Sequence, residues 1–233
     1  MSHTGPILEG QGASDYERYL RVPELLALQK EADQLIHPEE RLFQIVHQSA
    51  ELWLKEVDYE IDRAVAQIVE GHAEPAADLL HRCTLILDLL REQIVILETM
   101  APADYHVIRV SSLGRGSGGE SPGFSRLLTA GKRLWPPFEE MLTKRDTTLI
   151  AIERDPRGCY ELFRLVQALM DYDAAFMKWR YTHLRLAVRI IGARVSSLKG
   201  VPVNQLEFGT REPLFPQLWE TINELTAEFK PQY

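Results

Sequence analysis

At 233 residues, the chain is long enough to bury a substantial core in one large domain or two small ones. It contains 26 basic and 34 acidic residues, and the formal net charge of −8 disfavours binding to the phosphate backbone of nucleic acids. The basic residues are scattered among acidic ones and form no patch, so nucleic acid is excluded as an expected partner.

The sequence leads us to expect neither a membrane anchor nor a secretory signal. Residues 1–13 contain no apolar run, and no segment approaches the roughly 20 consecutive apolar residues that span a bilayer. Cys83 and Cys159 lie far apart, each within an apolar helical pattern, and are expected to be buried, reduced thiols. We therefore expect a soluble, cytoplasmic protein without a membrane partner.

Two amphipathic helices are predicted in the first half of the chain. Apolar side chains recur in steps of three and four over residues 39–70, and Gly71 ends this helix. The apolar stripe consists of Leu42, Val46, Ala50, Trp53, Val57, Ile61, Ala64 and Ile68. A second helix is predicted from about Pro75 to Met100. Its inward-facing positions are Leu79, Cys83, Ile86, Leu90, Ile94 and Ile96.

A glycine-rich segment interrupts the helical pattern near the middle of the chain. Pro102 marks a break, and residues 104–110 are expected to form a short helical turn. Residues 111–123 contain five glycines and a proline, a composition that demands a loop. These glycines do not form a phosphate-binding loop, because no predicted strand precedes them. We interpret the segment as a mobile or substrate-covering loop.

Helical patterns continue through the second half. Short helices are predicted at 124–130 and, after a break at Pro136-Pro137, at about 138–153. The longest helix is predicted over about 157–192, and a final amphipathic helix over 213–229.

The predicted fold is therefore an all-α helical bundle with long helices, organised as one domain over residues 1–233. The longest predicted helix is expected to project from a globule of this size. Apolar positions exposed on it would then contact another subunit, so we expect a homo-oligomer.

His183 lies beside the apolar stripe of the longest predicted helix. Three- and four-residue spacing places it on one face with Phe176, Trp179 and Leu186. One interpretation is an axial haem ligand, because a porphyrin needs large apolar neighbours and a neutral imidazole aimed at its iron. The alternative is a core histidine whose ring nitrogens are hydrogen-bonded within the protein.

Two further positions are candidates for substrate chemistry. His47 lies at the edge of an apolar surface and could hold a proton in a dry cavity; the alternative is a simple helix-surface pair with Glu51, one turn on. Tyr105 and Arg109 are four residues apart, so a helical turn would point them the same way. An arginine suits a carboxylate ligand, whereas a surface arginine paired with a nearby acid is the alternative.

Four segments, in order along most of the chain, resemble the tryptophan 2,3-dioxygenase superfamily. The first is Tyr16-Glu-Arg-Tyr19-Leu20, followed by Pro23-Glu-Leu-Leu-Ala-Leu-Gln, which looks like the family's opening segment. Leu42-Phe43-Gln-Ile-Val-His47-Gln-Ser-Ala-Glu51-Leu-Trp53 is similar to its distal-histidine helix. The remaining two are Asp104-Tyr105-His-Val-Ile-Arg109 and Trp179-Arg-Tyr-Thr-His183, continuing to Arg189-Ile-Ile-Gly192.

The resemblance implies a role for each matching residue. His183 would be the proximal ligand of a b-type haem, with Trp179 beside it, and His47 would hydrogen-bond the indole N–H from the distal side. Phe43 would pack on the indole ring, Arg109 would hold the substrate carboxylate, and Tyr105 would line the pocket. A homotetramer is also implied, in which the segment 1–30 packs on a neighbouring subunit. The residues placed in that shared site are Tyr16, Tyr19 and Leu20.

Two loops depart from the family pattern. The family's glycine-rich loop after the proximal helix corresponds here to Val195-Ser-Ser-Leu-Lys-Gly-Val, with Ser197 at the threonine position. The family's Pro-Ala-Ser-Gly segment corresponds to Gly114-Arg-Gly-Ser117-Gly. Ser117 and Ser197 are the counterparts of substrate contacts in these loops, and the changed glycine content is expected to alter loop closure.

The resemblance implies a haem-dependent oxygenase that inserts oxygen from dioxygen into the indole ring of L-tryptophan or a substituted tryptophan. Insertion of two atoms would yield N-formylkynurenine, and insertion of one at C2 or C3 would suit a specialised biosynthetic pathway. Two alternatives remain open: a hydroxylase of another aromatic amino acid, and a non-catalytic haem sensor on the same scaffold.

Overall fold

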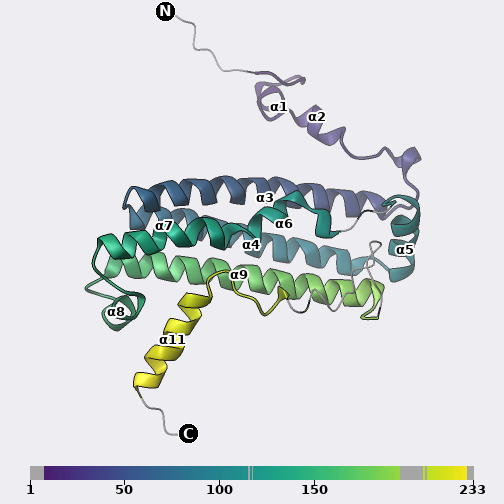
Figure 1. Ribbon diagram of the computed structural model, residues 1–233. Coiled ribbons are helices and arrows are strands. Elements are labelled where there is room, and N and C mark those ends of the chain that lie inside the picture. Colours follow the sequence, from purple (N-terminus) through teal and green to yellow (C-terminus); the bar gives the residue numbers. More distant parts are fainter. Residues whose placement is uncertain (1–7, 115, 117, 195–206, 208, 230–233) are drawn as a thin grey trace, which may run out of the picture.

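The computed structural model describes residues 8–114, 116, 118–194, 207 and 209–229. All regular elements in these ranges are helices, which confirms the all-α prediction. Three long helices, α3 (Glu40–Val69), α4 (Ala73–Val95) and α9 (Tyr160–Ile191), lie side by side, and α7 (Ala130–Lys144) packs against α3 (Figure 1). The chain is thus a bundle of long helices.

The apolar stripes that predicted the first two long helices form most of the core between them. In α3, Val57, Ile61 and Ala64 are fully buried, whereas Trp53 is 40% exposed and Leu54 takes the core position beside it. In the second stripe, Ile96 is 48% exposed, so its predicted inward orientation is wrong. The chain tightens at this point into the 3₁₀ helix η2 (Ile96–Thr99). Three residues per turn shift the register, and Leu97 becomes the buried residue.

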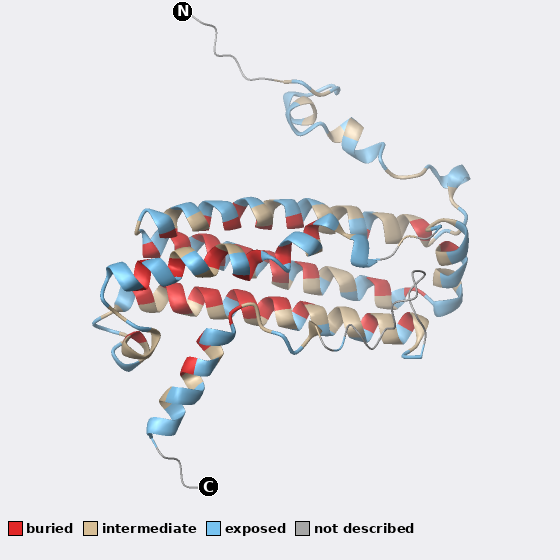
Figure 2. Cartoon of the chain, in the orientation of Figure 1, coloured by how far each residue is buried: buried red, intermediate tan, exposed pale blue. Residues whose placement is uncertain are grey.

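Buried side chains form two clusters along the bundle. Figure 2 marks the buried residues in red along the helices. The larger cluster joins α3, α4, α7 and α9, and the smaller one lies where α5 (Pro102–Ser111) packs against α9. Ile94 packs against both clusters. The free thiol of Cys83 is buried, as predicted, but Cys159 is only partly buried because it lies at the N-terminal end of α9.

Two predictions about the second half of the chain are wrong. Helix α7 continues through Pro136 and Pro137, where a break was expected. A proline removes a backbone donor and crowds the preceding turn, but Leu134 and Phe138 stay fully buried on either side of the pair, so packing outweighs this local cost. Helix α9 does not project either. It lies along α3 and α4, which have comparable lengths (Figure 1).

The segment that does stand away from the bundle is the N-terminal arm, formed by α1 (Asp15–Leu20), α2 (Val22–Leu26) and the 3₁₀ helix η1 (Ala32–Gln34) (Figure 1). None of these helices contains a buried residue. Buried Glu40, at the start of α3, binds the end of the arm. Its carboxylate lies 2.6 Å from Lys30 Nζ and accepts the backbone N–H of Ile36 at 2.9 Å.

Four shorter helices complete the described chain: η3 (Gly118–Glu120), α6 (Pro122–Leu127), α8 (Leu149–Arg154) and α11 (Pro216–Glu228). Asp173 fixes the chain just before α11. Its buried carboxylate accepts the N–H groups of Leu214 at 2.9 Å and Phe215 at 3.2 Å and the indole N–H of Trp219 at 2.9 Å. No helix in the described ranges is both long enough and apolar enough to traverse a bilayer.

Candidate active site

A cavity of about 310 Å³ opens between α3, α4 and α9, and the segment from η3 to the end of α6 covers one side of it. This volume is within the usual range of small-molecule sites, about 300–1,000 Å³. Its apolar lining residues are Val46, Ala50, Leu90, Ile94, Leu97, Phe124, Leu128, Phe176 and Trp179. Its polar lining includes His47, Glu51, Gln93, Ser121, Arg180, His183 and Glu212. The cavity therefore combines apolar walls with a few ionisable groups.

His183 is held at the end of a column of aromatic rings. Its imidazole stacks on Trp179, one turn earlier in α9, at 5.1 Å and 8° between ring planes. The Trp179 indole stacks in turn on Phe124 of α6, at 3.8 Å. A Cβ atom at Gly118 would lie 4.0 Å from His183 Nε2, so Gly118, the first residue of η3, lies close to the imidazole ring.

The protein keeps the His183 imidazole neutral. Burial, with a smaller contribution from His47, lowers the pKa of His183 to about 4. Within the described part of the chain, neither ring nitrogen of His183 takes part in a hydrogen bond. This arrangement does not support the alternative of a core histidine satisfied by the protein. A neutral, unpartnered imidazole is instead a ready ligand.

His47 borders the same cavity from α3, and its tautomer follows from its hydrogen bond. Nδ1 lies 2.7 Å from the backbone oxygen of Phe43. A carbonyl oxygen only accepts, so Nδ1 carries the proton and Nε2 keeps a free lone pair. Desolvation lowers the pKa of His47, although the residue as a whole is exposed. His47 is thus a neutral acceptor facing the same space as His183.

Glu51 fastens the covering segment to α3. Its carboxylate accepts the Ser121 hydroxyl and, at 3.2 Å, the backbone N–H of Gly123. A Cβ atom at Gly123 would lie 2.6 Å from the Cβ of Leu54, so only glycine allows α6 to approach α3 this closely. The sequence left open whether Glu51 pairs with His47 on the helix surface. In the structure, its hydrogen bonds hold the cover of the cavity.

The remaining predicted site residues of α3 and α5 form a group next to His47. The Phe43 ring lies 4.1 Å from the His47 ring and 5.9 Å from that of Tyr105. Burial raises the pKa of Tyr105, and the nearby charge of Arg109 opposes this rise. The structure therefore brings Phe43, Tyr105 and Arg109 together, but these three residues extend from the His47 side and do not line the cavity itself.

The structure does not bring the N-terminal residues to the site of their own chain. Tyr16, Tyr19 and Leu20 are 69%, 70% and 45% exposed on α1, which stands away from the bundle. Ser117 and Ser197, predicted as substrate contacts, lie outside the described residues.

Several residues of the cavity were missed by the sequence prediction, among them Arg180, Phe124 and Glu212. Arg180 lies three positions before His183, a helical spacing that could have identified it. Phe124 and Glu212 are remote in sequence from both histidines, and no local pattern marks them.

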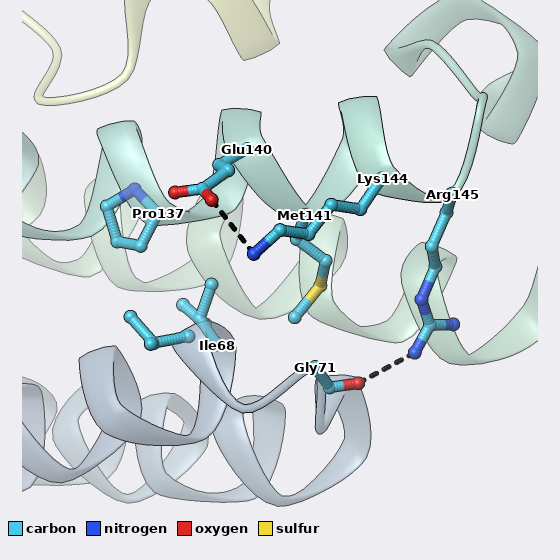
Figure 3. Close-up of a pocket in the computed structure, with 8 residues that line it drawn as sticks. Ile68, Gly71, Pro137, Glu140, Met141, Lys144 and Arg145 are labelled. Atoms are coloured by element: carbon cyan, nitrogen blue, oxygen red, sulfur yellow. Dashed lines mark hydrogen bonds and ion pairs between the residues drawn. The ribbon is translucent and has the colours of Figure 1, made fainter.

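A second, much smaller hollow of about 60 Å³ lies beside the C-terminal ends of α3 and α7, and Figure 3 shows it in close-up. The charged side chains drawn there already have partners. Lys144 Nζ lies 2.8 Å from a carboxylate oxygen of Glu140, and Arg145 donates to the backbone oxygen of Gly71 at 2.7 Å. This hollow lacks histidine, and its charged side chains already have partners within the protein, so the large cavity is the candidate active site.

Comparisons with known proteins agree with this assignment. Residues 1–134, more than half of the chain, match a family model described as Tryptophan 2,3-dioxygenase. The chain is 29% identical to a tryptophan 2,3-dioxygenase of Caulobacter vibrioides, over 90% of this chain and 98% of that protein. It is 26% identical to a tryptophan 2,3-dioxygenase of a Bradyrhizobium species, over 93% of this chain and 94% of that protein. For the one from Myxococcus xanthus, the identity is 25%, over 95% and 93%.

The helical fold and the histidine-lined cavity, taken with these relatives, define a haem-dependent oxidoreductase. The chain belongs to the tryptophan 2,3-dioxygenase family.

The residues around the cavity suit a porphyrin. A haem needs a neutral imidazole whose nitrogen is free to bind iron, and His183 meets both conditions. It also needs apolar surface for its flat ring, and the cavity is lined mainly by apolar side chains, which come from α3, α4, η2, α6 and α9 and from Leu128 just after α6. The donor chemistry of the site therefore fits the cofactor of the family.

Proposed function

We propose that this chain is a haem-dependent oxygenase of the indole ring of L-tryptophan, with His183 as the protein ligand of haem b. One observation carries the proposal. Two neutral histidines border one apolar cavity, and within the described residues neither has a hydrogen bond at Nε2. Nε2 of His183 is suited to bind iron, and Nε2 of His47 is suited to accept a hydrogen bond from the substrate.

His183 would hold the haem from the α9 side. The stack of Trp179 on its ring fixes the imidazole plane, which reduces the ordering needed when the iron binds. When bound, haem supplies the binding and activation of dioxygen, and the surrounding apolar walls keep water from the reacting groups.

His47 would orient the substrate from the α3 side. An indole N–H can only donate a hydrogen bond, and His47 Nε2 can only accept one in the tautomer described above. Phe43 lies against the His47 ring and would support the flat face of the indole. Arg109 would hold the carboxylate, with Tyr105 between it and Phe43. Together these residues would fix which indole carbon faces the oxygen.

The N-terminal arm would complete the site of a neighbouring subunit. Tyr16, Tyr19 and Leu20 are exposed on an arm without buried residues, a condition that favours packing against another chain. We therefore propose a homo-oligomer. Light scattering of the purified protein tests its mass, and a monomer at micromolar concentration would contradict it.

A single-turnover experiment under ¹⁸O-labelled dioxygen tests the enzymatic function. The reduced, hemin-loaded protein is mixed with L-tryptophan, and the number of ¹⁸O atoms in the product is determined from its mass by mass spectrometry. Two labelled oxygen atoms indicate dioxygenation to N-formylkynurenine, and one indicates monooxygenation. If the protein binds haem but leaves L-tryptophan and other aromatic amino acids unlabelled, the oxygenase function is wrong and the sensor alternative takes its place.

A further inference from the structure

Arg180 is a cation inside the apolar cavity that neither the family resemblance nor the proposed roles account for. It lies on α9, three residues before His183, and lines the same cavity. Its guanidinium stacks over the Phe176 ring at 4.6 Å from the centroid. Since Phe176 covers one face, the N–H donors in the plane of the guanidinium are the groups that remain for hydrogen bonds.

Most of these donors are unused in the described part of the chain. Nη2 donates to the backbone oxygen of Glu212, while Nε is buried and has no partner. A Cβ atom at Gly209 would lie 4.0 Å from Nη1, so Gly209 itself offers only backbone there. A guanidinium has five N–H donors, and a carboxylate can take two of them side by side.

No described carboxylate forms an ion pair with the Arg180 guanidinium, although the charges of Asp173 and Glu212 act on it. The buried carboxylate of Asp173 already accepts three N–H groups from the segment before α11 and from Trp219. Glu212 meets Arg180 through its backbone carbonyl, and no ion pair joins its carboxylate to the guanidinium within the described residues. Burial lowers the pKa of Arg180, the charges of Asp173 and Glu212 oppose this shift, and the guanidinium remains charged at neutral pH. A half-buried cation that no carboxylate contacts is costly, so the site favours an anionic ligand.

We propose that Arg180 is a carboxylate-binding site within the haem cavity. It is the only cationic side chain among the described residues that line this cavity. The carboxylate has two chemical sources, a propionate of the porphyrin or the carboxylate of the amino-acid substrate, which Arg180 would then hold in addition to Arg109. This inference rests on the proposed function, because both sources enter the cavity with it.

Paired ligands that differ only in the carboxylate test the assignment and identify its source. Hemin and hemin dimethyl ester are titrated into the haem-free protein and followed by the Soret band. L-Tryptophan and tryptamine are then titrated into the hemin-loaded protein. The variants are Arg180→Gln and Arg180→Lys, with Arg185→Gln as the control, because Arg185 is an exposed arginine of the same helix outside the cavity.

Arg180→Gln is expected to weaken one member of a pair by about tenfold or more, and its carboxylate-free counterpart far less. Selective loss of hemin identifies a propionate as the partner, and selective loss of L-tryptophan identifies the substrate. Arg180→Lys keeps the charge but not the fork of donors, so a smaller loss with the same selectivity is expected. If circular dichroism shows that Arg180→Gln is unfolded, the assignment is tested with Arg180→Lys instead.

Failure of this inference can be told apart from failure of the proposed function. If the wild-type protein gives no Soret band with either porphyrin, the proposed function is wrong and the assignment of Arg180 falls with it. If the wild type binds hemin and tryptophan but the Arg180 variants match Arg185→Gln for all four ligands, only the carboxylate site is overturned.

Discussion

Removal of the Glu51 carboxylate should release the cover of the cavity from α3. Glu51 accepts two hydrogen bonds, from the Ser121 hydroxyl and from the Gly123 N–H at 3.2 Å. Hydrogen bonds to a charged group contribute about 1.5–3 kcal/mol each. Glu51 is only partly buried, so the lower end applies, and we expect Glu51→Ala to reduce the free energy of unfolding by about 2–3 kcal/mol. Glu51→Gln keeps one acceptor oxygen and should lose about half of that.

A double-mutant cycle separates this contact from a general effect of losing a charge. Glu51→Ala, Ser121→Ala and the double variant are unfolded in urea at pH 7, and a coupling energy of about 1–2 kcal/mol is expected. Glu56→Gln is the matched control, since it removes a carboxylate of α3 that has no hydrogen bond within the described residues. Faster hemin dissociation from Glu51→Ala should accompany the loss. A coupling energy below about 0.3 kcal/mol would refute the role of Glu51 as a tether.

Four further outcomes are expected. His183→Ala should abolish stable haem incorporation, measured by the Soret absorbance per protein; haem content near that of the wild type would refute the ligand assignment. His47→Ala should retain haem but change the turnover rate, and complete loss of haem would mean that the two faces of the cavity are reversed. Arg109→Ala should mainly raise KM, because it removes about 2–3 kcal/mol of binding free energy for the substrate. An unchanged KM in steady-state assays would exclude contact between Arg109 and the substrate. Burial would raise the pKa of Glu40, but its hydrogen bonds, chiefly that from Lys30, lower it to about 2. The resulting stabilisation, about 3 kcal/mol, is present above pH 4.5 and lost as the pH falls toward 2. The free energy of unfolding of Glu40→Gln, measured in urea, should therefore depend less on pH over this interval than that of the wild type. An identical pH dependence of the two proteins would contradict this role of Glu40.

The sequence alone was enough for the helical class and for the positions of the long helices. Apolar spacing of three and four residues is a local property, so it located α3, α4 and α9 to within a few residues. It also marked His47 and His183, because each lies beside such a stripe. Where the local rule changed, the prediction was wrong. The 3₁₀ turn at Ile96 shifted the register, and buried neighbours carried α7 through Pro136 and Pro137.

Only the tertiary structure decided how the separate motifs become a site. The contacts of Glu51 with Ser121 and of Phe124 with Trp179 join residues more than 50 positions apart. The unpartnered donor of Arg180 depends on what the segment around Glu212 leaves open. Helical period reports which face of one helix avoids water, and it contains no information on which other segment covers that face. Which segment covers a helix face depends on the packing of the whole chain. That packing determines the tautomer and charge of the groups in the cavity, and which of their hydrogen-bond donors and acceptors remain unpaired.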